Sequence, residues 1–454
     1  MFLDNFYNLA NKGDTIYFAG IGGISMSALA KFMINNGYKV CGGDLKKSLL
    51  TEELENLGAK IYYKFNKKHL QGVKLFVYSS AIQKTDKQLK LAKKLNIKII
   101  KRSELLNLIV QNYTTSIAVA GTHGKTTTSS MITSILECAS KNPTAFIGGE
   151  SIDYSNLKIG KTNYCVLEAC EYQKNFLDIK PTISVLTNIG ADHLECFSDL
   201  TSEVKTFSEF LGEKLNIINV DDENSSSLIN LFSITYGIKN KAHYMATKVS
   251  VKNNKASFVL EAGGVSKGRI SLRVGGLYNV YNALASAAIC SHLKISFSAI
   301  RRGLERFENV KRRNEKIGNI GETNFICDYA HHPTEIENVL SLYDNKSTLV
   351  VFQPHTYSRT KNLMKEFAAA FRNVENLIIY KTYPAREKFD KKSSAKALYN
   401  NIKAESQKNI LYAENLKILY KTIKEVGKNY KNVLFLGAGD IYELAIDYIK
   451  NNKF

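Results

Sequence analysis

The residues with the clearest chemical role form one Gly-rich segment near residue 120. An apolar run at 117–120 predicts a strand before it, and the run at 129–140 predicts a helix after it. Glycines let backbone N–H groups approach phosphate oxygens, and a helix N-terminus adds partial positive charge. The layout therefore predicts a phosphate-binding loop, in which Lys125 reaches the β- and γ-phosphates and the Thr126 hydroxyl holds Mg²⁺. The segment reads Gly121, Thr122, His123, Gly124, Lys125, Thr126 and Thr127.

The loop departs from the usual phosphate-loop spacing at one position. The common pattern has a Gly five residues before the Gly of Gly-Lys-[Ser/Thr], whereas this chain has Val119 there. The loop is therefore a shortened variant, which reduces the number of protein families to which the chain can belong. The alternative is a strand-to-helix turn that is merely rich in Gly and Thr. The position of the Gly-Lys-Thr sequence between a predicted strand and a predicted helix argues against that alternative.

Acidic and imidazole side chains follow two further strands of the central third. Glu168 ends the apolar run at 164–167, where a second Mg²⁺ ligand belongs beside a phosphate loop. His193 follows the strand at 182–188, next to Asp192. A lone His is usually structural, but its place at another strand end of the same edge favours a role in the site.

Two asparagines open an Ala-rich helix after residue 275. Asn279 and Asn282 are three residues apart and therefore share a helix face. Two amides on one face can read the donor and acceptor edge of adenine. The alternative is that Asn279 caps the helix and Asn282 is incidental.

The N-terminal third begins with a strand, a Gly-rich turn and a helix. The turn contains Gly20, Gly22 and Gly23, but Ser25 replaces the third Gly of the dinucleotide fingerprint. The pattern favours a mononucleotide or pyrophosphate site over NAD, with a ligand-free tight turn as the alternative. A later strand at 75–78 ends in Ser79 and Ser80, which either contact phosphate or cap the next helix.

The last third again alternates strands and helices, with charged residues after the strands. Arg313 lies at an expected domain junction, either reaching ATP phosphates or standing in a solvated basic turn. Asp328 ends the strand at 324–327. His355 and Arg359 follow the strand at 348–352, so these ends predict a binding edge.

The composition describes an ordinary globular protein with a basic surface. The 454 residues are too many for one core, with 44% hydrophobic and 23% charged residues. The net charge of +20 raises nucleic acid as a partner, but the lysines are spread along the chain without a basic arm. We therefore expect a solvated surface and no nucleic-acid partner. The seven cysteines lack a Cys-x-x-Cys pair, and no signal peptide or membrane-length apolar stretch is evident, which predicts a cytoplasmic protein.

These patterns predict an α/β protein of three domains. We expect a Rossmann-like domain over 1–112, a central phosphate-loop ATP-binding α/β domain over 113–310, and a Rossmann-like α/β domain over 311–454. A β-rich segment is expected within 232–273.

The motifs together resemble the Mur ligases of peptidoglycan precursor synthesis over nearly the whole chain. The shortened loop with Val119 is the family's own form, and its combination with His331-His332-Pro333-Thr334-Glu335 is specific. The other matching stretches are Gly20–Met26, Glu168–Glu171, Asn188–His193, Phe352–Arg359 and Tyr383–Glu387. The chain departs from common family residues at Tyr278, Thr356 and Cys170.

The resemblance implies a role for each candidate residue. The first domain would bind the UDP of UDP-N-acetylmuramate through the turn at Gly20 and through Ser79 and Ser80. Thr126, Glu168 and His193 would hold Mg²⁺ ions beside the ATP that Lys125 contacts. The residues that would complete the ATP site are Asn279, Asn282, Arg313 and Asp328. His355 and Arg359 would meet the lactyl carboxylate or the incoming amino acid.

The implied activity is ATP-dependent amide ligation. L-Alanine would be joined to the lactyl carboxylate of UDP-N-acetylmuramate through an acyl phosphate, with release of ADP and phosphate. We expect a monomer or homodimer, and the lack of a membrane-length apolar stretch predicts that the chain spans no membrane. A related ligase that adds a recycled peptide to the same sugar nucleotide is the nearest alternative. A nucleic-acid-dependent ATPase would leave the turn at Gly20 unexplained.

Overall fold

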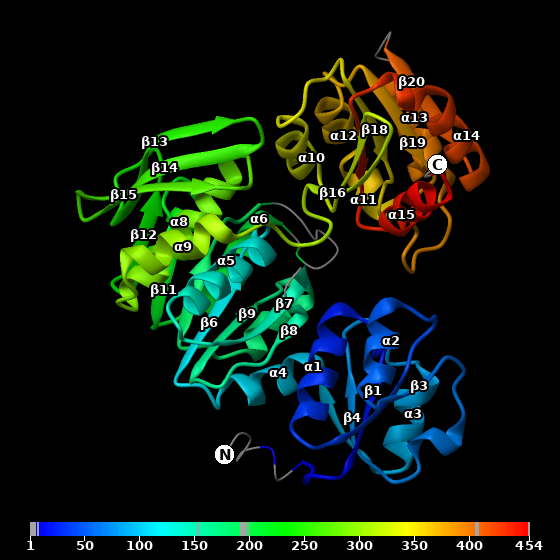
Figure 1. The fold of residues 1–454 in the computed structure, drawn as a ribbon. Helices are drawn as coiled ribbons and strands as arrows, with labels where there is room; N and C mark the ends of the chain where they lie inside the picture. Colours follow the sequence, from blue (N-terminus) through cyan, green and yellow to red (C-terminus); the bar gives the residue numbers. More distant parts are fainter. Residues whose placement is uncertain are drawn as a thin grey trace. The chain divides into compact units, whose positions relative to one another are not determined.

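Three sheets with helices packed on them make up the part of the chain that the structure describes. The structure is a computed structural model and describes residues 6, 9–151, 154–190, 197, 199–404 and 408–452. The chain divides into two compact units, which Figure 1 shows in sequence colours. The first is Met1–Ser250, Ala256–Arg273 and Asn279–Glu308, and the second is Val251–Lys255, Val274–Tyr278 and Asn309–Phe454.

The N-terminal sheet of the first unit is parallel and five-stranded, in the order β3-β2-β1-β4-β5. Ile16 and Phe18 face the core with α1 and α4, whereas Tyr17 stacks on Phe76 in the core with α3. The strand order reverses between β1 and β4, so the Gly20 turn opens at a topological switch point. The elements are β1 (Thr15–Ala19), α1 (Ile24–Asn35), β2 (Lys39–Gly43), α2 (Leu49–Asn56), β3 (Lys60–Tyr62), β4 (Val73–Tyr78), α3 (Lys87–Lys94), β5 (Lys98–Lys101) and α4 (Arg102–Val110).

The central sheet has ten strands, in the order β15-β14-β13-β12-β11-β10-β6-β9-β7-β8. The expected β-rich segment forms its edge at β12 to β15 (Figure 1). The strands are β6 (Thr115–Ala120), β7 (Thr144–Ser151), β8 (Ser155–Lys158), β9 (Tyr164–Glu168), β10 (Ile183–Leu186), β11 (Leu215–Asn219), β12 (Ser233–Gly237), β13 (Tyr244–Lys252), β14 (Lys255–Ala262) and β15 (Val265–Leu272). The helices are α5 (Lys125–Cys138), α6 (Leu200–Leu211), α7 (Glu223–Ser226), α8 (Leu277–His292) and α9 (Phe297–Arg306).

The sheet of the second unit has six strands, in the order β16-β17-β21-β18-β19-β20. Alternate strand residues pack on two helical layers, with α10, α12 and α13 on one face and α14 and α15 on the other. The strands are β16 (Glu315–Ile320), β17 (Thr323–Asp328), β18 (Thr348–Phe352), β19 (Asn376–Tyr380), β20 (Asn409–Ala413) and β21 (Asn432–Leu436). The helices are α10 (Pro333–Leu340), α11 (Tyr357–Asn362), α12 (Met364–Ala370), α13 (Ala395–Ala404), α14 (Leu416–Val426) and α15 (Ile441–Asn452).

A buried polar cluster, which we call the α1–β8 clasp, joins the two sheets of the first unit. Lys31 on α1 is 6% exposed, and its Nζ lies 2.5 Å from a Glu53 oxygen and 2.7 Å from Asn156 Oδ1. The fully buried Asn156 on β8 donates from Nδ2 to the Ile24 carbonyl and, at 2.7 Å, to Ser27 Oγ. These contacts fix the first turns of α1 to the central sheet.

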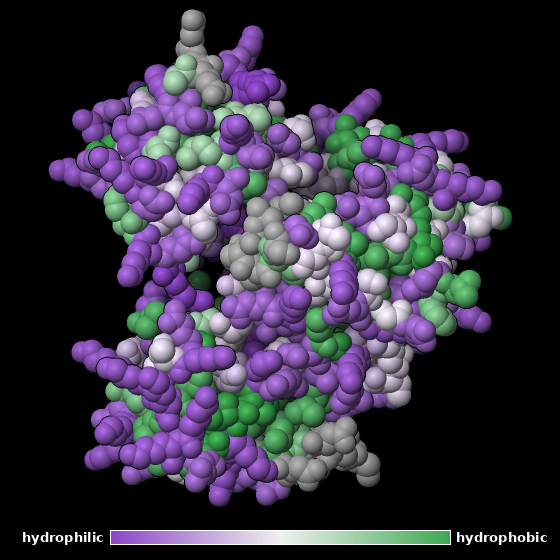
Figure 2. Space-filling model, turned by 180° about the vertical axis from the view of Figure 1, so that it is seen from behind, coloured by the Kyte–Doolittle hydropathy of each residue, from purple (hydrophilic) through white to green (hydrophobic). Residues whose placement is uncertain are grey.

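The visible surface in Figure 2 is mostly hydrophilic, with smaller apolar areas between. This agrees with the lysine-rich composition of the chain. Within the described ranges, the structure contains no helix that combines the length and apolar character needed to span a membrane.

Candidate active site

The phosphate loop connects β6 to α5, as the sequence predicts. Gly121 and Gly124 have φ of +132° and +86°, a region that favours glycine. A Cβ at Gly121 would overlap Thr187 Oγ1 and lie 2.9 Å from the Asn188 carbonyl oxygen. A Cβ at Gly124 would overlap Asn282 Oδ1. Both glycines are therefore required by conformation and by space.

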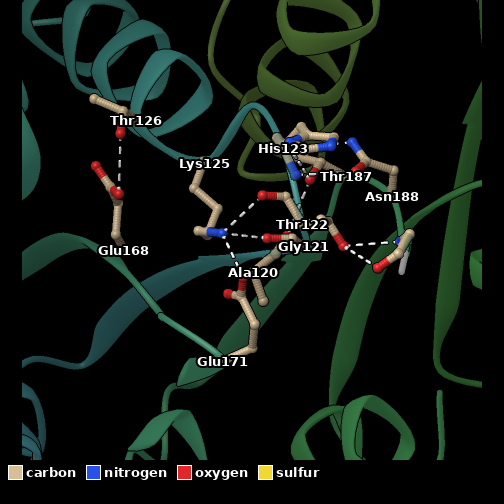
Figure 3. Close-up of polar contacts among 11 residues, drawn as sticks. Ala120, Gly121, Thr122, His123, Lys125, Thr126, Glu168, Glu171, Thr187 and Asn188 are labelled. Carbon is tan, nitrogen blue, oxygen red and sulfur yellow. Dashed lines mark hydrogen bonds and ion pairs between the residues drawn. The ribbon is translucent and has the colours of Figure 1, made fainter. Parts of the chain in front are cut away.

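Side chains that follow β10 hold the loop from one side (Figure 3). Asn188 Oδ1 accepts from the His123 backbone N–H at 3.0 Å, and its Nδ2 donates to the His123 carbonyl at 3.1 Å. Thr187 Oγ1 donates to the same carbonyl at 2.6 Å. The Thr122 N–H donates to the Asn188 carbonyl at 2.9 Å. The loop is thus anchored to the neighbouring strand end by side-chain and backbone hydrogen bonds.

Lys125 is the first residue of α5 and points back along the loop (Figure 3). Its Nζ donates to the carbonyls of Gly121 at 2.5 Å and Thr122 at 3.0 Å, and lies 2.9 Å from Glu171 Oε1. Lys125 is 15% exposed and Glu171 only 1%. Burial acts to lower the pKa of the Lys125 amine, but the Glu171 carboxylate outweighs it, so that pKa lies above its ordinary value. The ammonium is therefore charged and held where phosphates would meet the loop.

An oxygen pair lies beside the loop on the β9 side. Thr126 Oγ1 donates to Glu168 Oε2 at 3.1 Å, and Glu168 Oε1 accepts from the Gly148 N–H. A hydroxyl and a carboxylate oxygen suit Mg²⁺, which commonly takes few protein ligands and completes its shell with phosphate and water oxygens. The two residues therefore fit one magnesium ion. No cluster of three or more metal-ligating side chains occurs among the described residues.

The asparagine pair lies inside α8. The helix begins at Leu277, so Asn279 is not its cap, and that alternative reading is wrong. Asn282 Nδ2 donates to Asn279 Oδ1 at 3.2 Å, and Asn282 Oδ1 accepts from Thr128 Oγ1 at 3.2 Å. Both residues are buried, and Asn282 contacts the first turn of α5 through Thr128. The adenine contact stays a prediction.

The Gly20 turn lies at the carboxyl edge of the N-terminal sheet. Gly20 has φ of +77°, and the Gly22 N–H donates to Asp44 Oδ2 at 2.7 Å. Ser79 Oγ lies 3.9 Å from the position of a Cβ on Gly20, so the turn and the end of β4 adjoin. The structure excludes Ser79 and Ser80 as helix caps, because α3 begins at Lys87 and its cap is Asp86. Gly23, the N-cap of α1, provides no side-chain cap, and the first turn of α1 contains no acidic residue.

His355 and Arg359 lie together in the second unit. Arg359 Nη1 is 3.5 Å from His355 Nδ1, and the His355 ring stacks on Tyr383 at 5.6 Å and meets the His331 ring edge-on at 5.8 Å. His331 Nδ1 lies 3.2 Å from Glu335 Oε2. The residues come from segments after β17, β18 and β19, as the strand-end pattern predicts.

Arg313 and Asp328 also belong to the second unit. The Arg313 guanidinium lies 5.0 Å from the centre of the Tyr329 ring. Asp328 accepts from the backbone N–H groups of Ala330 and Asn314, each at 2.7 Å. Burial raises the pKa of the Asp328 carboxyl to about 6, against the opposing effect of Arg313. Burial raises the pKa of the Tyr278 hydroxyl, and the Asp328 charge adds to that rise whereas the Arg313 charge opposes it.

The structure thus brings Lys125, Thr126 and Glu168 together, and it adds residues that the sequence did not single out. Glu171, Thr187 and Asn188 hold the loop. All three follow strands, and Glu171 and Asn188 also lie in stretches that match the family, but the sequence assigned none of them a role in the site. His193 lies outside the described residues, so its role stays a prediction. Cys170, between the two glutamates, is a protonated thiol rather than a third acid, because burial and Glu171 raise its pKa.

Comparisons with known proteins agree with this arrangement. Residues 15–114 match a model of the Mur ligase family catalytic domain, 119–290 the Mur ligase middle domain and 312–439 the Mur ligase glutamate ligase domain. The UDP-N-acetylmuramate–L-alanine ligase of Clostridium tetani is 38% identical over 96% of this chain and 98% of its own, and that of Aquifex aeolicus 35% over 96% and 97%. The crystal structure of UDP-N-acetylmuramate–alanine ligase from Thermotoga maritima has a TM-score of 0.84 at 28% identity, covering 96% of this chain and 98% of that one.

Proposed function

This chain belongs to the Mur ligase family, and we propose that it joins L-alanine to the lactyl carboxylate of UDP-N-acetylmuramate, using ATP. The product would be UDP-N-acetylmuramoyl-L-alanine, a peptidoglycan precursor. The full-length similarity to ligases of that name in Clostridium tetani and Aquifex aeolicus supports this substrate pair.

The observation that carries the proposal is the grouping of Lys125, Thr126 and Glu168 on the shortened phosphate loop. A carboxylate that attacks ATP brings negative charge toward negative charge, so cations must offset the repulsion. Lys125 would orient and neutralise the β- and γ-phosphates. Thr126 and Glu168 would hold a magnesium ion, which supplies further charge stabilisation.

The proposed chemistry has two steps. The lactyl carboxylate attacks the γ-phosphorus, the bond to the ADP oxygen breaks, and an acyl phosphate forms. The neutral amine of L-alanine then attacks the acyl carbon, and the tetrahedral intermediate loses one amine proton to solvent and expels phosphate as the amide forms. Phosphorylation is needed because a carboxylate has no good leaving group toward an amine.

Substrate placement would use three groups of residues. The Gly20 turn and the uncapped start of α1 favour the diphosphate of the sugar nucleotide. His355 and Arg359 suit a carboxylate, since a guanidinium binds carboxylates through charge-assisted hydrogen bonds. Asn279, Asn282, Arg313, Asp328 and His193 remain proposed members of the ATP site.

The test measures phosphate release from MgATP with each amino acid in turn, with and without UDP-N-acetylmuramate. Release should require both the sugar nucleotide and L-alanine, and the product mass should rise by one alanyl residue. Release that ignores the sugar nucleotide would refute a ligase function. A murein peptide accepted in place of L-alanine would indicate the peptide-recycling activity.

A further inference from the structure

The proposed mechanism gives the segment Tyr383–Glu387 no role, yet both ends of this segment contact the His355 segment. The Thr356 N–H donates to the Tyr383 carbonyl at 2.9 Å, and the Tyr383 N–H donates to the Pro354 carbonyl at 2.9 Å. These bonds form a parallel bridge beyond the ends of β18 and β19. The loop after β19 therefore fixes the backbone that carries His355.

Glu387 ends this segment and binds the first turn of α11. Its Oε2 accepts from the backbone N–H groups of Tyr357 at 2.6 Å and Ser358 at 2.9 Å. Its Oε1 accepts from the Ser358 hydroxyl. One carboxylate thus satisfies three donors immediately before Arg359.

The backbone of Thr356 has an unfavourable conformation that contacts from other segments must stabilise. Thr356 has φ of +66° and ψ of 150°, a conformation that a β-branched residue rarely adopts. Its Oγ1 accepts from the Arg359 N–H at 3.3 Å. The Tyr383 bridge holds Thr356 on one side and Glu387 holds the next two residues on the other. Without Glu387, we expect Thr356 to relax and the α11 turn to rotate.

Relaxation there would separate the two side chains that suit a carboxylate. His355 directly precedes Thr356, and Arg359 leaves the same turn, with Nη1 3.5 Å from His355 Nδ1. We propose that Glu387 is a positioning residue, which holds His355 and Arg359 in the geometry that binds a substrate carboxylate. This inference rests on the proposed function, because it takes the carboxylate from L-alanine or UDP-N-acetylmuramate.

The test compares steady-state kinetics of Glu387→Ala, Glu387→Gln and the wild-type enzyme for all three substrates. Losing the charge-assisted hydrogen bonds should raise the KM of L-alanine or UDP-N-acetylmuramate about tenfold or more in Glu387→Ala. The KM of ATP should stay within about twofold, because the phosphate loop lies on another sheet and the hydrogen bonds of Glu387 go to Tyr357 and Ser358 rather than to Arg313 or Asp328. Glu387→Gln keeps an acceptor oxygen and should recover most of the loss.

Asp390→Ala is the matched control. Asp390 lies in the same loop and also caps a turn, accepting from the Lys392 N–H at 3.0 Å and the Ser393 hydroxyl at 2.6 Å. Because its bonds do not involve the His355 segment, its three KM values should stay within about twofold of wild type.

Wild-type turnover with all KM values unchanged in Glu387→Ala would overturn the positioning role. So would an equal rise in all three KM values. A wild-type protein that releases no phosphate with these substrates would instead overturn the proposed function. If Glu387→Ala fails to fold by circular dichroism, Ser358→Ala removes the Oε1 bond together with the 3.4 Å contact between the Ser358 and Thr356 hydroxyls, and it leaves both backbone bonds to Glu387 in place. A rise in the KM of the same carboxylate substrate then supports the role, and no rise refutes it.

Discussion

The ion pair between Lys125 and Glu171 yields a quantitative prediction about stability. Its atoms are 2.9 Å apart, and both side chains are largely removed from solvent. Removing one partner of a buried pair leaves an uncompensated charge, which costs about 3–5 kcal/mol. We expect Lys125→Met to lower the free energy of unfolding by about 3 kcal/mol, the lower end, because Lys125 retains 15% exposure.

A double variant measures the coupling energy between Lys125 and Glu171 apart from the contacts that each residue makes with other groups. Lys125→Met with Glu171→Gln removes both charges and should recover about 2 kcal/mol relative to the sum of the single variants. The measurement is urea unfolding by far-ultraviolet circular dichroism, without nucleotide, for the wild type, both single variants and the double variant. All variants that lack Lys125 should be inactive even where stability recovers.

An exposed pair in the same unit provides the control. Lys47 and Glu52 lie 3.3 Å apart at 59% and 48% exposure, so their coupling should be under about 0.5 kcal/mol. Effects of Lys125→Met and Glu171→Gln that add to within about 0.5 kcal/mol would refute the reasoning, since independent sites behave that way. Appreciable turnover by Lys125→Met would refute its assignment to the phosphates.

Three further predictions follow from the geometry. Gly121→Ala should abolish binding of a fluorescent ATP analogue, because its Cβ would overlap Thr187 Oγ1, whereas Gly13→Ala, with nothing within 4 Å, should bind normally. Glu168→Gln should raise the Mg²⁺ concentration for half-maximal phosphate release about tenfold, because the carboxylate charge is lost; an unchanged magnesium dependence would contradict the oxygen pair. Asp328, with a folded-state pKa of about 6, binds its proton more tightly folded than unfolded. The free energy of unfolding should therefore decrease as pH rises from about 4 to about 6, by up to about 1.4 kcal/mol per pH unit. Urea titrations of Asp328→Asn should lack that slope.

The local pattern of the sequence correctly predicted the strand, Gly-rich turn and helix that form the loop, and the α/β alternation. A Gly-rich turn between an apolar strand and a helix is determined by neighbouring residues. The helix boundary was less accurate, because α5 begins at Lys125 rather than at Ser129. Thr126, Thr127 and Thr128 are β-branched, and the local pattern predicted them to be part of the loop. They form the first turn of α5, because the Gly-rich turn directly before them starts the helix there.

The partners of the loop could not be predicted in the same way. Glu171 reaches Lys125 only because β9 lies beside β6, and Asn188 reaches His123 only because β10 lies on the other side. That strand order depends on contacts between distant segments, which periodicity does not reveal. Glu387 is a similar case, since its three donors lie about thirty residues earlier in the chain.

The α1–β8 clasp has a consequence for inhibitor design. It is a buried network centred on Lys31 and Asn156, and it joins α1, the helix that follows the Gly20 turn, to the sheet that carries the phosphate loop. Disrupting it would leave buried polar groups unpaired, so the spacing between these two anchor points resists change. A compound that joins a mimic of the diphosphate proposed at the Gly20 turn to a mimic of the triphosphate proposed at the phosphate loop therefore faces a fixed span within this unit. Its linker should be rigid and of one length, since a flexible linker would lose affinity through conformational entropy.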